Sequence, residues 1–189
     1  MPLSTIDPQA ALIVIDLQKG ILAAPAAHPI ADVIENAGAL ASAFREQGLT
    51  VVLVTVTGTA PGRTDAAASS RQTAQAPPAD FAEIIDGLDP QPEDHRIVKQ
   101  RWGAFTDTSL HEHLRGLGVT QIFLAGVATS IGVESTARFA HEHGYHVVLV
   151  TDAMTDTSPD AHINSVERVF PRLGETACAS DVLAMLERR

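Results

Sequence analysis

The stretch QIFLAGVATSIGVESTARFAHEHGYHVVLVTD, residues 121–152, decides the fold. Its apolar runs at residues 121–124 and 145–150 predict two strands, and the segment 131–143 between them predicts a helix. A strand, a helix and a second strand in this order form a βαβ unit, in which the two strands are parallel. Ligands bind beyond the carboxyl ends of such strands and near helix N-termini, so the turn before Gly132 is a candidate site.

Further apolar runs extend this pattern along the chain. AALIVID at residues 10–16 and TVVLVTVT at residues 50–57 are rich in β-branched residues, as buried parallel strands are. Shorter strands are predicted at residues 96–98 and 176–178, and helices at residues 30–47, 81–88, 109–117, 158–170 and 180–186. Serine residues at 109 and 158 are the expected N-caps of two of these helices. Strands interleaved with helices predict a doubly wound α/β fold.

Composition narrows the classes of function. A chain of 189 residues with 45% hydrophobic content predicts a single domain, residues 1–189. The formal net charge of −10 argues against nucleic acid and anionic membrane surfaces as partners, and no apolar run is long enough for a membrane helix. The single cysteine, Cys178, cannot form an internal disulfide, and we expect a cytoplasmic protein in which this thiol is buried.

Two charged residues at strand ends are candidates for chemistry. Asp16 ends the strand at residues 10–16, although an aspartate that simply starts a loop has the same pattern. Lys99 follows the strand at residues 96–98 and is one of only two lysines in the chain. The segment 58–79 is a long connection rich in small and polar residues, which favours a lid, an oligomer contact or a disordered loop.

The remaining polar residues give weaker signals. Within the segment 58–79, Arg63 and Arg71 could bind a substrate carboxylate, although solvated arginines are commoner. The histidine pairs 111 and 113, and 141 and 143, are each two residues apart on predicted helices, so their members point to different faces. We therefore expect solvated histidines, no metal site and no cofactor.

Several short motifs together resemble the isochorismatase-like hydrolases. They are Asp16-Leu17-Gln18 after an apolar strand, Lys99 before Arg101-Trp102-Gly103-Ala104-Phe105, Gly126-Val127-Ala128-Thr129, and Thr136-Ala137. The resemblance covers residues 10–156 and implies a three-layer α/β/α fold with a six-stranded parallel sheet of order 3-2-1-4-5-6. It also implies a cis peptide bond before Ala128 and a homodimer or larger homo-oligomer.

The resemblance leaves three possible functions open. Most members of this broad family use an Asp, Lys, Cys triad, but this chain has Gly132 at the cysteine position, as the isochorismatases do. For that branch the family implies that Asp16 donates a proton to a vinyl ether in a small carboxylated substrate, with Lys99 as its polar partner. The turn Ala128-Thr129-Ser130 is closer to the cysteine amidases. This leaves two alternatives: a weak water-dependent amidase, or a noncatalytic small-molecule-binding or interaction protein derived from a cysteine amidase.

The same resemblance gives the expected site residues. Asp16, Lys99 and Gly132 form the predicted catalytic group, with Gly132 leaving room for a water molecule. The expected substrate contacts are Gln18, Arg63, Trp102 and Ala128. The backbone amides near Gly132 and the Gln18 side chain are candidates to hold that water or a substrate oxygen.

Overall fold

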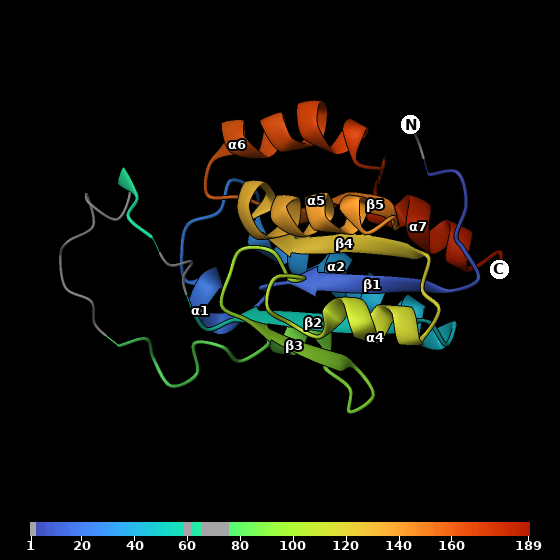
Figure 1. Cartoon of the computed structure of the whole chain (residues 1–189), viewed down its shortest axis with the longest axis horizontal. Helices are drawn as coiled ribbons and strands as arrows, with labels where there is room; N and C mark the ends of the chain where they lie inside the picture. Colours follow the sequence, from blue (N-terminus) through green and yellow to red (C-terminus); the bar gives the residue numbers. More distant parts are fainter. Residues whose placement is uncertain (1–2, 59–61, 66–75) are drawn as a thin grey trace.

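The chain folds around one parallel β-sheet. A computed structural model describes residues 3–58, 62–65 and 76–189, and the sheet order is β3-β2-β1-β4-β5-β6, which confirms the expected order (Figure 1). Most of the segment 58–79, including Arg71, lies outside the described residues. The strands are β1 (Ala10–Ile15), β2 (Thr50–Val56), β3 (His95–Lys99), β4 (Gln121–Val127), β5 (His146–Thr155) and β6 (Glu175–Ala177).

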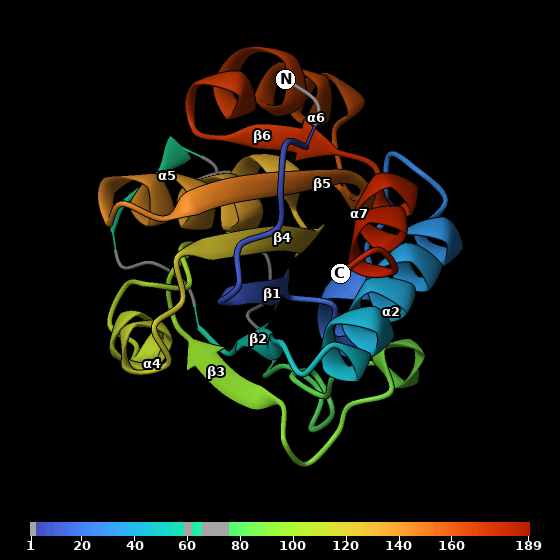
Figure 2. The same cartoon turned by 90° about the vertical axis from the view of Figure 1, so that its right-hand side faces the viewer.

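Helices cover both faces of this sheet, so the expected three-layer α/β/α architecture is confirmed. Figure 2 shows α2 and α7 on one face and α4 and α5 on the other. The helices are α1 (Lys19–Leu22), α2 (Ile30–Glu46), α4 (Leu110–Gly116), α5 (Glu134–Glu142), α6 (Pro159–Asn164) and α7 (Ala179–Leu186). The Ser158 side chain caps α6 by accepting a hydrogen bond from the Ala161 amide, as its position before proline predicts.

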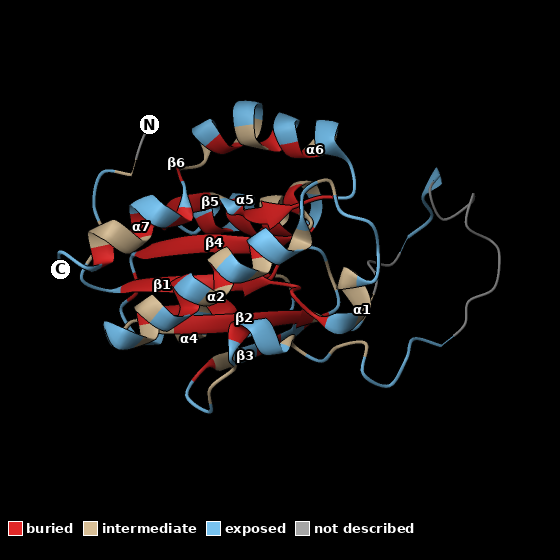
Figure 3. Ribbon diagram, turned by 180° about the vertical axis from the view of Figure 1, so that it is seen from behind, coloured by how far each residue is buried: buried red, intermediate tan, exposed pale blue. Residues whose placement is uncertain are grey.

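The side chains of successive strand residues point to opposite faces of the sheet, so the hydrophobic core has two halves, one on each face. In β1, Leu12 and Val14 face the layer of α2 and α7, whereas Ile13 and Ile15 face the layer of α4 and α5. All six residues of β1 are buried, because helices cover both of its faces, and Figure 3 shows the central strands in the colour of buried residues. The continuous apolar runs of the sequence are a consequence of this double burial.

The carboxyl ends of β1 and β4 meet at one edge of the sheet. The arrowheads of both strands point toward α1 in Figure 1, and Ile15 pairs with Gly126 in the register between them. Gly126 has a φ of +112°, and a Cβ at this position would collide with the carbonyl oxygen of Ile15. Only glycine allows the two strands to run this close just before their functional turns.

Two predicted helices differ from the structure. Residues 81–88 form turns and a short 3-10 helix, Asp86–Leu88, in place of a helix. The reason is tertiary: the Phe81 and Glu83 carbonyls accept hydrogen bonds from the amides at the start of α1. Ser109 precedes α4 as expected, but its side chain makes no capping bond.

The other departures concern helix continuity. The helix predicted for residues 131–143 is preceded and partly replaced by a π-helical turn, Thr129–Val133, with α5 following. The helix predicted for residues 158–170 is regular only in α6 and continues as a π-helical turn and a 3-10 turn that contains Pro171. π-helical turns are often found at functional sites, and the first of these two turns contains Gly132.

Candidate active site

Asp16 stands at the carboxyl end of β1, where the sequence places it. Its backbone has a φ of +53°, an uncommon conformation for a residue other than glycine, and its side chain is buried. The Oδ2 atom accepts a hydrogen bond of 2.7 Å from the Lys99 ammonium. The Oδ1 atom is buried and has no hydrogen-bond partner among the described residues. One oxygen of the carboxyl group is thus fixed by Lys99, and the other makes no hydrogen bond within the part of the chain that the structure describes.

Lys99 reaches this carboxyl group from two strands away. It is the last residue of β3, while Asp16 follows β1, and β2 lies between these strands. The Lys99 side chain is only 2% exposed, and its ammonium also donates a hydrogen bond of 3.2 Å to the Arg101 carbonyl oxygen. A buried ammonium requires such partners, because desolvation strongly disfavours an unpaired charge.

Burial and the ammonium act in opposite directions on the acidity of Asp16. Burial raises the pKa of Asp16, the charge and hydrogen bond of Lys99 lower it, and the net result is a pKa of about 6. Desolvation is therefore the larger effect. A carboxyl group with this pKa still carries its proton in about a tenth of the molecules at pH 7, far more than an ordinary aspartic acid does, and a general acid needs this proton.

Gly132 lies directly against the Asp16 carboxyl group. A Cβ built on Gly132 would lie 3.3 Å from Asp16 Oδ2, 3.2 Å from the Val127 carbonyl oxygen and 3.0 Å from Ile15 Cγ2. These contacts are tighter than ordinary van der Waals distances, so the room beside Gly132 is narrower than the sequence suggests. The position supplies no nucleophile and leaves only its backbone and this small space beside the acid.

The turn that contains Gly132 is held from the side of α6. The Val127–Ala128 peptide bond is cis, as the family resemblance implies. Asp156 Oδ2 accepts hydrogen bonds of 2.8 Å from both the amide and the hydroxyl of Ser130, and the Thr129 hydroxyl lies 2.9 Å from Nδ1 of His162. Burial raises the pKa of Asp156, but hydrogen bonds from Ser130 and neighbouring amides outweigh burial and lower it.

Asp156 and His162 were not among the expected site residues. The signal for Asp156 was present in the sequence, because it follows β5 as Asp16 follows β1. His162 gives no such signal, since only the packing of α6 against the turn brings it to Thr129. Neither residue contacts Asp16 or Lys99 in the described hydrogen bonds, and both act on the turn instead.

The four expected substrate contacts have different environments. Gln18 is fully buried; its amide group donates to the Val56 and Phe81 carbonyl oxygens and its oxygen accepts from the Val56 amide. It therefore joins β2 to the chain around residue 81 and has no free donor for a substrate. Arg63 is exposed, Trp102 is 57% exposed in the loop after Lys99, and Ala128 is half-buried in the cis turn.

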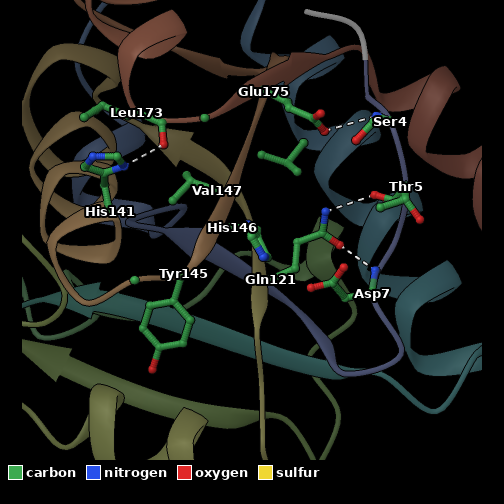
Figure 4. A pocket seen from close by; sticks show the side chains of 13 residues that line it. Ser4, Thr5, Asp7, Gln121, His141, Tyr145, His146, Val147, Leu173 and Glu175 are labelled. Carbon is green, nitrogen blue, oxygen red and sulfur yellow. Dashed lines mark hydrogen bonds between the residues drawn. The ribbon is translucent and has the colours of Figure 1, made fainter.

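Hollows occur at both ends of the parallel strands, one beyond their carboxyl ends and one beyond their amino ends. A small, mostly apolar pocket of about 40 Å³ touches the turn through Val127, Ala128 and Asp156. A larger hollow of about 490 Å³ lies at the amino ends of β4 and β5, where the Gln121 side chain bonds to Thr5 and Asp7 (Figure 4). This larger hollow is therefore at the edge opposite to Asp16 and is separate from the candidate active site.

The histidines and the cysteine differ from expectation. His111 stacks on His143 and His113 stacks on His95. The expectation of solvated side chains is wrong for His111 and His113, which are half-buried, whereas His141 and His143 are exposed. Within residues 3–58, 62–65 and 76–189, no three His, Cys, Asp or Glu side chains gather as metal ligands would. Cys178 is exposed, contrary to prediction, because β6 ends at Ala177 and Cys178 is the N-cap residue of α7. None of the described helices is long and apolar enough to cross a membrane.

A buried acid, a buried ammonium and a cis turn meet where the strand order of the parallel sheet reverses, which is where enzymes of the doubly wound α/β class bind their ligands. Residues 10–181 match the Isochorismatase domain family. The chain is 38% identical to the uncharacterized isochorismatase family protein YecD of Escherichia coli O157:H7, over 93% of this chain and 95% of that protein. It therefore belongs to the isochorismatase family, whose members are hydrolases.

Two other relatives extend this result. A structure of an isochorismatase family protein from Burkholderia thailandensis superposes with a TM-score of 0.88 and 39% identity, over 97% of this chain and 98% of that one. The ureidoacrylate amidohydrolase RutB of Rhizobium rhizogenes is 34% identical, but over only 58% of this chain and 44% of RutB. The similarity that extends over the full length is thus to family members whose names give no substrate.

Proposed function

We propose that this hydrolase cleaves a vinyl ether in a small carboxylated substrate by acid catalysis from Asp16. The supporting observation is the Asp16 carboxyl group itself: Oδ2 is bonded to Lys99, Oδ1 is buried with no hydrogen-bond partner in the described part of the chain, and the pKa is raised to about 6. A carboxylic acid with one fixed oxygen and one free oxygen can direct its proton at a bound substrate. At pH 7 about a tenth of the molecules carry this proton.

The reaction needs an acid and a water molecule. Asp16 Oδ1 transfers its proton to the terminal vinyl carbon, and the electron pair of the double bond forms the new C–H bond. The resulting oxocarbenium ion is attacked by water, which loses a proton to the Asp16 carboxylate. The hemiketal then breaks its C–O bond, and its hydroxyl proton passes to the leaving oxygen, which yields an alcohol and a keto acid. The net change is addition of one water molecule, and Asp16 returns to its protonated form.

Lys99 and Gly132 have supporting roles in this proposal. The Lys99 ammonium stabilises the Asp16 carboxylate that forms when the proton leaves, at a distance of 2.7 Å. Gly132 keeps side-chain atoms out of the narrow space beside Asp16 Oδ2, where water approaches. Trp102, Ala128 and Arg63 are proposed as substrate contacts at the same edge of the sheet, whereas the bonds of Gln18 favour a structural role.

A water-dependent amidase is the second candidate. It is supported by the similarity to RutB, a ureidoacrylate amidohydrolase, over part of the chain. In this mechanism the Asp16 carboxylate would take a proton from the attacking water, so activity would require the deprotonated form. A noncatalytic binder that retains the pocket is the remaining alternative from the sequence.

A product assay separates these candidates. The protein is incubated with isochorismate and with a panel of primary amides, and release of pyruvate or ammonia is measured. Pyruvate release that exceeds the uncatalysed rate supports the proposal. Ammonia without pyruvate supports the amidase, and no product from any compound that binds in calorimetry supports the binder. Conversion of Gly132 to cysteine adds a test, since it raises amide cleavage only in a site that is otherwise built for amides.

The assembly and the location are proposed from the sequence. A homodimer or larger homo-oligomer is supported by the exposed apolar side chains of Trp102, Ile131 and Phe139. Light scattering after size-exclusion chromatography tests it, and a monomer at micromolar concentration would contradict it. The cytoplasmic location expected from the single cysteine stays a prediction, which fractionation of cells that produce the protein tests.

A further inference from the structure

The two sides of the candidate active site are joined by a hydroxyl group that lies outside it. Thr136, in the first turn of α5, is fully buried. Its hydroxyl donates a hydrogen bond of 2.7 Å to the Gly132 carbonyl oxygen and accepts one of 3.0 Å from the Ala104 amide. Both polar functions of this hydroxyl are therefore used, one on the turn of Gly132 and the other on the loop that follows Lys99.

That loop also fixes the ammonium of Lys99. The Arg101 carbonyl oxygen accepts a hydrogen bond from Lys99 Nζ, and Ala104 lies three residues further along. Between them, Gly103 packs so closely on α5 that a Cβ there would lie 3.2 Å from the Phe139 ring. The loop thus lies along α5, and its position decides where Arg101 presents its carbonyl oxygen to Lys99.

These contacts form a closed ring around the acid. The ring runs from Asp16 to Lys99 and Arg101, along the loop to Ala104, through Thr136 to Gly132, and from Gly132 back to Asp16 Oδ2. Every link except that between Gly132 and Asp16 is a hydrogen bond or the chain itself. Thr136 is the only link in which a side chain holds two backbone segments together, so its loss opens the ring without touching the acid or the ammonium.

We propose that Thr136 is a positioning residue, whose hydroxyl keeps the loop of Ala104 and the turn of Gly132 in register and thereby holds Lys99 on Asp16. The catalytic meaning of this role rests on the proposed function of Asp16. The positioning of Lys99 by Thr136 does not depend on that function, because the contact between Lys99 and Asp16 can be followed without a substrate. A small displacement of a catalytic group is enough to lower turnover strongly.

The test uses variants that separate the hydroxyl from the shape of the side chain. Thr136→Val keeps the shape and removes the hydroxyl, Thr136→Ser keeps the hydroxyl, and Thr120→Val removes a threonine hydroxyl that bonds Asp7 at the opposite edge of the sheet. The first readout is the titration of the Asp16 carboxyl carbon by ¹³C NMR, assigned by its absence in Asp16→Asn. The second is kcat and KM on whichever compound the product assay identifies.

In Thr136→Val we expect Lys99 to withdraw from Asp16, so that the Asp16 titration moves upward by about one unit from its value near 6. We expect kcat to fall roughly 10- to 100-fold, with KM changed by less than about threefold. Thr136→Ser and Thr120→Val should match the wild type in both readouts. If Thr136→Val does not fold, Thr136→Ala, in which a water molecule can enter, takes its place with the same readouts.

An unchanged Asp16 titration and an unchanged kcat in a folded Thr136→Val or Thr136→Ala would overturn the inference. So would an equal loss in Thr136→Ser, because the methyl group would then be responsible. Failure of the proposed function gives a different result. In that case Asp16→Asn keeps full activity, while the upward shift of the Asp16 titration in Thr136→Val still supports the positioning role.

Discussion

The Lys99 ammonium lies 2.7 Å from Asp16 Oδ2, although β2 separates the strands from which the two residues come. This pair is almost completely enclosed, with side-chain exposures of 2% for Lys99 and 8% for Asp16. Enclosure raises the pKa of Asp16 more than the ammonium lowers it, and the result is an acid that titrates at about 6. Desolvation of two buried charges costs about as much free energy as their attraction returns, so the pair adds little net stability. Its properties support a role in proton transfer instead.

Replacement of Asp16 by asparagine removes the proposed acid. We expect Asp16→Asn to lose turnover by roughly 100- to 10,000-fold, the range that a positioned general acid contributes. Steady-state kinetics on the identified substrate measure this loss, and circular dichroism shows whether the fold is kept. Asp7→Asn, which changes a carboxylate that bonds Thr120 at the opposite edge of the sheet, is the control and should keep full turnover. Full turnover in folded Asp16→Asn would exclude this role.

The pH dependence of kcat/KM reports the protonation state of Asp16 in the free enzyme. An acid must be protonated to act, so kcat/KM should be constant below about pH 6 and fall tenfold per pH unit above it. The water-dependent amidase would show the opposite slope, because it requires the carboxylate. A rate profile between pH 5 and 8.5 distinguishes these cases, and a profile that is flat through pH 6 contradicts both.

Replacement of Lys99 by methionine tests the other half of the pair. Among the described residues, Lys99 alone lowers the pKa of Asp16, through its charge and its hydrogen bond. In Lys99→Met we therefore expect Asp16 to titrate above 6, and the descending limb of the rate profile should move to higher pH by the same amount. The ¹³C NMR titration of the Asp16 carboxyl carbon measures the shift. Lys19→Met, at an exposed lysine that pairs with Glu83, provides the control.

A substitution at Gly132 tests whether the reaction needs the space beside this residue. A Cβ at this position would crowd Ile15, Val127 and Asp16 at 3.0 to 3.3 Å. We expect Gly132→Ala to lower the free energy of unfolding by about 1–3 kcal/mol, as overpacking does, and to lower turnover because water loses its approach. Urea denaturation and steady-state kinetics measure the two effects. Gly116→Ala, where a Cβ meets nothing within 4 Å, is the matched control. Wild-type turnover in Gly132→Ala would show that this space has no part in the reaction.

The fold was predictable because its strands are buried on both faces. Residues 10–16 and 50–57 have no alternation to interpret, and their continuous apolar character is what a central parallel strand requires. The segment 81–88 was predicted wrongly for a physical reason. Its local pattern favours a helix, but the amides at the start of α1 donate hydrogen bonds to two of its backbone carbonyl oxygens. No local pattern records such a long-range pairing.

The candidate site was predictable where function depends on strand ends. Asp16 and Lys99 follow strands, and parallel strands bring such residues to one edge. Asp156 also follows a strand and gives the same signal, whereas Thr136 acts through hydrogen bonds to the Ala104 amide and the Gly132 carbonyl oxygen, which spacing in the sequence cannot reveal. Gln18 shows the converse: its position beside Asp16 suggests a ligand contact, whereas the chain around Val56 and Phe81 binds its side chain.

The histidines of α4 were expected to be solvated, and their actual packing has a consequence for stability. His113 stacks on His95 at 3.4 Å between ring centroids, and His111 stacks on His143 at 4.0 Å. Burial lowers the pKa of His95, His111 and His113; in addition, the neighbouring imidazole lowers that of His95 and that of His111. Arg45, Glu93 and Asp94 line the hollow beside His95 and His113, where Asp94 is already paired with Arg45.

A lowered pKa in the folded state means that the unfolded chain binds more protons. The stability that these histidines contribute is present above their unfolded pKa of about 6.5 and is lost as the pH falls through their lower folded values. We expect the melting temperature to drop by roughly 2–4 °C for each ~1 kcal/mol lost between pH 7 and 5. His113→Phe keeps a ring on His95 but cannot bind a proton, so its drop should be smaller, whereas His146→Phe, at an exposed histidine, should match the wild type. Calorimetry at several pH values measures these differences, and equal drops in His113→Phe and the wild type would show that the stacked pair of His95 and His113 does not control acid stability.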